Sequence, residues 1–211
     1  MLIEVRPDGD LNAAYLHQEQ FCRTGVLTGS NFTIDTPSMF QPVSIAESRW
    51  SRFSDSRSTK GSFNLQPDGG KLIASGDWFK SRSEHGHVLS SVVSTRGRIE
   101  QTTTPNTYIS TFEYPINALY YLDKSKQWHR SENITTGKSF ILTPVDASMV
   151  IPILTEEMNA FAERNRQFLA TASNRPGHFI AIATGAAAID TNPSIHWKET
   201  RTIITGPVVL P

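Results

Sequence analysis

Glycine and proline interrupt the chain at short intervals from about residue 25 to residue 146, and this spacing limits the fold more than any other feature. Both residue types break regular elements, so a long helix does not fit between them. The stretches that remain are rich in Val, Ile, Tyr, Phe and Thr, which favour strands. The best strand candidates are residues 72–74, 87–94, 107–114, 118–122 and 139–142. The pattern predicts short, mostly antiparallel strands.

Two stretches have the spacing of amphipathic helices. Apolar residues recur at helical intervals from Leu11, which follows a possible Asp10 N-cap, and this predicts a helix over about 11–22. A second helix is predicted over about 156–172, with Thr155 as its cap and acidic residues in its first turn. Its apolar stripe should be buried and consists of Phe161, Phe168 and Leu169.

Two later stretches, residues 179–184 and 202–210, read as strands. The expected fold class is therefore α+β, a mostly antiparallel β-sheet with two packed helices. The chain has 211 residues, 38% of them hydrophobic, which is enough to bury a core. No repeat or composition shift marks a boundary, so a single globular domain over 1–211 is expected.

The charge balance bears on the kind of partner. The chain has 20 Lys and Arg and 20 Asp and Glu. Proteins that bind nucleic acid generally carry a basic excess, so neutrality counts against general nucleic-acid binding. The first residues show no basic stretch followed by an apolar one, and no window is apolar enough to span a bilayer. We expect a soluble protein without membrane insertion, cytoplasmic or delivered by a secretion system.

One cysteine and one close histidine pair are the simplest candidates for reactive or metal-binding groups. Cys22 has no second cysteine to pair with. It is interpreted as a buried small hydrophobe, with a nucleophilic role as the alternative. His85 and His87 alternate, so both could face one metal with Glu84 or Asp77 as a third ligand. The favoured interpretation is solvated loop histidines, and we expect no metal.

Three scattered segments have a suggestive order. Arg52 lies in a stretch with three arginines, Ser94 and Thr95 follow an apolar run, and Glu199 precedes the predicted last strand. The order resembles the Arg…Ser-Thr-Ser…Glu pattern of mono-ADP-ribosyltransferase toxins and effectors. Here Arg96 stands at the third position of the Ser-Thr-Ser motif.

The resemblance implies an NAD-dependent transferase effector that modifies an unknown protein or small-molecule acceptor. NAD would be the substrate, with Arg52 and Thr95 in its binding site. An arginine can hold the NAD phosphates through charge-assisted hydrogen bonds. Ser94 and Glu199 would be the catalytic residues, the serine orienting the carboxylate that stabilises the charge developing on the ribose. Glu156 and Glu157 are the alternatives for the catalytic carboxylate.

Two further functions stay open. The β-rich region carries the aromatic residues Trp78 and Trp128, and Trp197 follows later, so the chain could be a non-enzymatic binding module for a glycan, a peptide or a protein. These indole rings could stack on sugars, or they could belong to the core. The neutral charge and many short strands also permit a structural subunit of a phage or virus particle.

Overall fold

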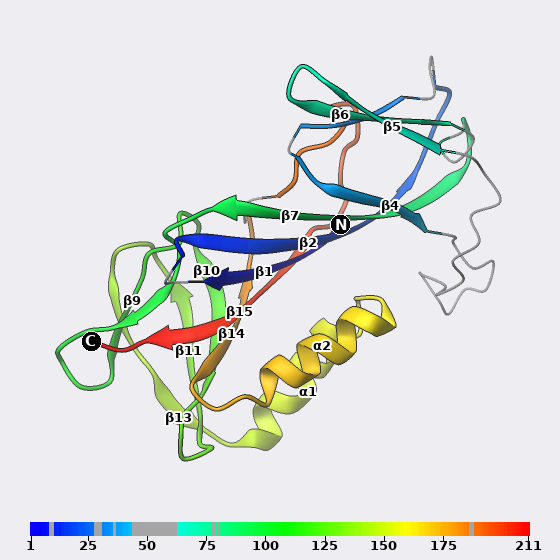
Figure 1. Cartoon of the computed structure of the whole chain (residues 1–211). Helices are drawn as coiled ribbons and strands as arrows, with labels where there is room; N and C mark the ends of the chain where they lie inside the picture. The colour runs from blue at the N-terminus through cyan, green and yellow to red at the C-terminus, as the bar shows by residue number, and fades with distance from the viewer. Residues whose placement is uncertain are drawn as a thin grey trace. The chain divides into compact units, whose positions relative to one another are not determined.

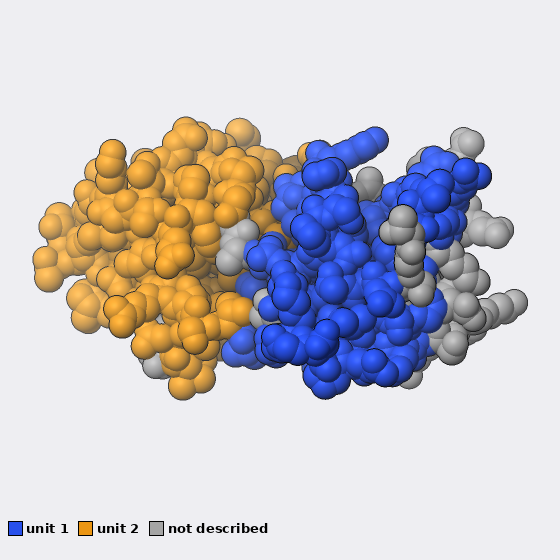
Figure 2. Space-filling view, turned by 90° about the horizontal axis from the view of Figure 1, so that it is seen from above, with its two compact units in different colours: residues 1–2, 16–92, 188–200 blue, residues 3–15, 93–187, 201–211 orange. Residues whose placement is uncertain are grey.

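The computed structural model describes residues 1–8, 11–27, 31–35, 37–43, 63–76, 79, 81–185 and 188–211. They form two compact units, shown in separate colours in Figure 2. Unit 1 consists of residues 1–2, 16–92 and 188–200, and unit 2 of residues 3–15, 93–187 and 201–211, outside the gaps just given. The single domain over 1–211 stays a prediction.

The predicted class, a β-rich α+β fold, is confirmed. The described residues contain two helices, and nearly all strand pairs are antiparallel (Figure 1). In this part of the chain no helix is long and apolar enough to cross a membrane.

The main sheet of unit 2 is built around β10, which pairs antiparallel with β11 on one side and with β14 on the other. β14 also pairs with β15, and the order is β13-β11-β10-β14-β15-β1. Its strands are β1 (Leu2–Asp8), β10 (Ile116–Leu122), β11 (Trp128–Ile134), β13 (Thr143–Val145), β14 (His178–Ala183) and β15 (Arg201–Val209). The mostly buried, apolar sequence of β14 fits its place between two strands.

Three short strands extend unit 2. β9 pairs antiparallel with β8 and with β12, and β8 runs parallel to the end of β15. They are β8 (Ile99–Gln101), β9 (Thr107–Ser110) and β12 (Ser139–Ile141). The predicted strands in unit 2 are therefore confirmed, although the one starting at residue 107 ends at residue 110.

Unit 1 contains most of β2 (Ala13–Arg23) and of β7 (Glu84–Ser94), with β4 (Met39–Val43) beside β7. A separate small sheet has the order β3-β6-β5. Its strands are β3 (Phe32–Ile34), β5 (Phe63–Asp68) and β6 (Lys71–Gly76). The turn between β5 and β6 uses Gly69 and Gly70, both with positive φ, a conformation that glycine adopts readily.

The helix predicted over about 11–22 is wrong, because residues 13–23 form strand β2. Every second residue from Ala14 to Cys22 is buried, which is the period of a strand. Two of these buried positions are Gln18 and Gln20, and their polarity hides the alternation in a hydrophobicity pattern. The buried side-chain amide of Gln18 has hydrogen-bond partners in the core. Its Nε2 donates to the carbonyl of Ile189 and its Oε1 accepts from the N–H of Ile189, each at 2.9 Å.

The helix predicted over about 156–172 is in fact two helices, α1 (Ala147–Met158) and α2 (Glu163–Ser173). The N-cap of α1 is Asp146, whose Oδ1 accepts from Ser148 N–H at 2.7 Å, whereas Thr155 lies inside the helix. The acidic residues after Thr155 therefore mimic a helix start that does not occur there.

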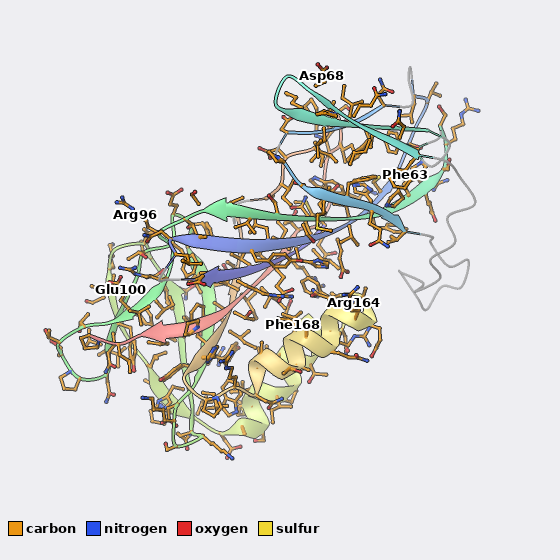
Figure 3. The ribbon with its side chains drawn as sticks, viewed as in Figure 1. Phe63, Asp68, Arg96, Glu100, Arg164 and Phe168 are labelled. Atoms are coloured by element: carbon orange, nitrogen blue, oxygen red, sulfur yellow. The ribbon has the colours of Figure 1, made fainter. Side chains whose placement is uncertain are left out.

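The predicted apolar stripe is only partly buried. Phe161 and Leu169 are buried, as predicted, but Phe168 is 43% exposed. Phe161 lies in the link between the helices, so the three residues do not share one helical face. The ring of Phe168, labelled on α2 in Figure 3, instead covers Arg6, whose guanidinium carbon is 3.3 Å from the ring centroid.

Phe168→Ala is therefore expected to lower the free energy of unfolding by only about 1 to 2 kcal/mol, the value of a cation–π contact with partial burial. Urea unfolding followed by circular dichroism measures the change. Thr171→Ala, on an exposed position of the same helix, should change stability by less than about 0.5 kcal/mol. A loss above about 3 kcal/mol for Phe168→Ala would contradict the half-exposed ring.

Candidate functional site

The structure describes three of the four residues proposed for an ADP-ribosyltransferase site. Ser94 is exposed at the end of β7, and Thr95 follows it in unit 2. Glu199 is exposed in unit 1, two residues before β15, and its carbonyl accepts from the N-terminal ammonium of Met1 at 2.7 Å. Arg52 lies outside the described residues. The assignment of these four residues to an NAD site stays a prediction.

The alternative carboxylates lie on α1. Glu156 is exposed, and Glu157 is half-buried with Arg201 at 3.8 Å. The contact between Glu157 and Arg201 is a weak one at this distance, and it links α1 to the start of β15 within unit 2.

The histidine pair is not the solvated loop that the sequence predicts. His85 and His87 lie in β7 and are both buried. Alternate residues of a strand share a face, so both rings enter the core of unit 1, among Phe32, Phe40 and Phe79. Ring centroids are 4.5 Å apart for Phe32 and His87 and 4.9 Å apart for Phe79 and His85. Aromatic neighbours, which the sequence spreads over 48 residues, create this apolar surrounding.

Burial lowers the pKa of His87 to about 3, and the neighbouring His85 adds to the shift. His87 is therefore neutral at pH 7, and its Nε2 is hydrogen-bonded to the side chain of Gln20. Glu84 precedes His85 in the strand and so faces the opposite side, and Asp77 lies outside the described residues. Over the described ranges, no three His, Cys, Asp or Glu side chains gather in a way that could hold a metal ion.

Cys22 is buried in β2, and burial raises the pKa of its thiol to about 11. The thiol is therefore protonated at neutral pH, which agrees with the interpretation of Cys22 as a small hydrophobe. Only its secondary structure differs from the prediction.

The two tryptophans that the structure describes are not fully exposed for stacking on a sugar. Trp128 is buried at the start of β11, and Trp197 is half-buried in unit 1. Trp78 lies outside the described residues. Trp128 therefore belongs to the core, the alternative that the sequence left open.

The exposed side of α1 carries both apolar and polar side chains, the polar ones being Ser148, Thr155 and Glu156. Val150 and Leu154 are buried, while Met149 is 60% and Ile151 54% exposed. We call this region the α1 surface; it consists of the exposed residues Ala147, Met149, Ile151 and Pro152. Met149 and Ile151 are two residues apart, so on the helix they lie on opposite flanks of the buried Val150, and each can contribute separately to a contact with a partner.

Charges of opposite sign accompany the α1 surface on the two helices. Residues 146–158 include three acids and no Lys or Arg. Residues 163–175 include three arginines and one acid, and Arg164 is exposed on α2 (Figure 3). The helix pair thus combines an apolar surface with an acidic and a basic segment.

Most sheet edges are poorly suited to pairing with another strand. Among the described strands, β3, β4, β5 and β13 stand at the ends of the two sheet orders, and all of them except β3 contain a proline. These prolines are Pro42, Pro67 and Pro144. Proline lacks the N–H that a ladder needs, so it blunts these edges.

The α1 surface was not predicted from the sequence, because the predicted helix begins at about residue 156. The pair Asp146 and Ser148 before an apolar run was the available signal, since Asp is a strong N-cap residue. Pro152 obscured it, because proline inside a stretch usually argues against a helix.

No known protein family, curated protein or solved structure matches the chain.

Proposed function

We propose that this protein is a structural subunit that binds copies of itself, as the subunits of a phage or virus particle do. The observation that carries the proposal is the α1 surface, where Met149 and Ile151 are more than half exposed on one helix. Binding is stabilised when a partner removes apolar side chains from water, by about 1.5 to 3 kcal/mol for the full burial of each side chain.

The charge pattern favours a second copy as the partner. The chain has equal numbers of acidic and basic residues, so two copies do not repel each other through net charge. In a two-fold symmetric contact each surface occurs twice, and the acidic α1 of one copy can meet the basic α2 of the other. The prolines in the edge strands favour contact through helices over addition of a strand.

Analytical ultracentrifugation over a concentration series tests the proposal. We expect wild-type protein to self-associate, and Met149→Lys/Ile151→Lys to weaken association at least about tenfold by placing charges in the apolar contact. Thr103→Lys/Thr104→Lys, in an exposed turn of unit 2, adds the same two charges elsewhere and should leave association unchanged. A wild-type protein that stays monomeric at the highest concentration would contradict self-association.

A charge exchange tests the pairing of the two helices. Glu156→Arg and Arg164→Glu should each weaken association slightly, by about 0.2 to 1 kcal/mol, and the two changes together should restore it. If the double variant is as weak as the sum of the single variants, the two residues do not face each other across the contact.

A further inference from the structure

A serine, a histidine and a glutamate form a chain of contacts on the sheet of unit 1. His17 Nδ1 lies 3.3 Å from Ser90 Oγ, and His17 Nε2 lies 3.3 Å from Glu19 Oε1. Ser90 and His17 come from β7 and β2, which lie side by side (Figure 1). Glu19 follows His17 by two residues in β2, so both project from the same face.

The three residues differ in burial in a way that suits chemistry. Glu19 is buried, while His17 and Ser90 are half-buried. Ser90 pairs directly with Met39 of β4, so these side chains share a face of the sheet, and Val92 follows on that face two residues later. Met39 and Val92 are both exposed. A substrate can therefore reach the serine from the solvent side.

The contacts fix the proton on the imidazole ring. A carboxylate only accepts hydrogen bonds, so Nε2 carries the proton and donates a hydrogen bond to Glu19. Nδ1 is then left with a lone pair directed at the hydroxyl of Ser90. A nucleophile, a base within reach of it and a third group that orients the base are the arrangement that activates serine. In serine proteases the nucleophile contacts Nε2 instead, but the same division of roles applies.

We propose that Ser90, His17 and Glu19 form a nucleophilic site that hydrolyses carboxylic esters with an apolar acyl chain. Ser90 Oγ forms a bond to the acyl carbon while His17 Nδ1 takes the hydroxyl proton. The carbon–alkoxy bond breaks, and His17 gives that proton to the leaving alcohol. Water then attacks the acyl carbon while His17 Nδ1 takes one of the water protons. The bond between the acyl carbon and Ser90 Oγ breaks, His17 gives that proton to Oγ, and the carboxylic acid leaves. Glu19 is a positioning residue, and Met39 and Val92 offer contacts to the acyl chain.

Hydrolysis of p-nitrophenyl butyrate and labelling with a fluorophosphonate, located by mass spectrometry, test the site. We expect the fluorophosphonate on Ser90 and a loss of roughly a hundredfold in hydrolysis for Ser90→Ala and for His17→Asn. Ser194→Ala and His196→Asn remove an exposed serine and an exposed histidine of unit 1, and should leave the rate unchanged. A folded protein without label on Ser90, or a Ser90→Ala variant with the wild-type rate, overturns the proposal.

Ser90→Cys provides a second measurement that does not depend on turnover. Cys22, the native thiol, is buried and protonated, so iodoacetamide should report on residue 90. We expect fast alkylation with a midpoint well below pH 8.5, and a midpoint shifted upward when His17→Asn or Glu19→Gln is added. An unshifted midpoint in both added variants would show that His17 does not activate residue 90. Self-association through the α1 surface is measured separately and does not depend on either result.

Discussion

Arg6→Met is expected to lower the free energy of unfolding by about 3 to 5 kcal/mol, because it leaves the carboxylate of Glu4 buried without its partner. Glu4 is fully buried in β1, and Arg6 donates to its two oxygens at 2.7 and 2.8 Å. The same guanidinium lies against the ring of Phe168 and 3.4 Å from Asn165 Oδ1, both on α2. Arg6 therefore also holds α2 on the sheet of unit 2. Urea unfolding of both proteins measures the difference.

The double variant Arg6→Met/Glu4→Leu separates the buried charge from the lost packing. Removing both charges takes away the uncompensated carboxylate, so the double variant should recover most of the stability lost in Arg6→Met. If it is less stable than Arg6→Met alone, the effect of Arg6 comes from its contacts with α2 and not from Glu4.

Acidification from pH 7 to pH 4 should destabilise the protein by about 3 kcal/mol through His87 alone. The pKa of this imidazole is lowered to about 3 by burial, against 6.5 for an ordinary histidine. Between these two values the unfolded chain binds a proton that the folded chain does not. The contribution is therefore fully present above pH 6.5 and is lost progressively as the pH falls toward 3.

The variant His87→Phe isolates this contribution. Phenylalanine keeps a ring beside Phe32 and Phe40 but does not titrate. The difference in unfolding free energy between wild type and His87→Phe should change by about 3 kcal/mol over this pH range, since other groups cancel. Asp123 is one such group common to both proteins: burial raises its pKa, but hydrogen bonds from Ser125, Gln127 and His129 outweigh this effect and lower the pKa to about 2. Parallel curves for the two proteins would refute a neutral, buried His87.

The sequence predicted the fold class and most strands because these depend on local signals. Turn residues such as Gly69 and Gly70 and the apolar run in β14 act over a few positions. The errors arose where a tertiary contact decides the structure. Gln18 is buried only because Ile189 supplies its hydrogen bonds, 171 residues away. A single sequence does not contain the strand pairing that brings such residues together.

The candidate sites show the same limit. His17 and Ser90 are 73 residues apart, and their contact depends on which strands are neighbours. The histidine pair was visible as a motif, but its burial depends on rings contributed by three other segments. The site of Arg52, Ser94, Thr95 and Glu199 rests on the order of these residues along the chain and stays a prediction.

The interleaving of the two units has a consequence for how the protein is made. Unit 1 uses residues from the start of the chain and also residues 188–200, so neither unit is one continuous stretch. The buried amide of Gln18 can form its hydrogen bonds only after 171 more residues, up to Ile189, have been synthesised. At ordinary translation rates this synthesis takes roughly 10 to 30 s. Until then the side chain of Gln18 in β2 lacks its native hydrogen-bond partner and can bond to other groups of the nascent chain. Slowing translation should therefore lower the yield of native protein, and chaperones that shield nascent chains should raise it.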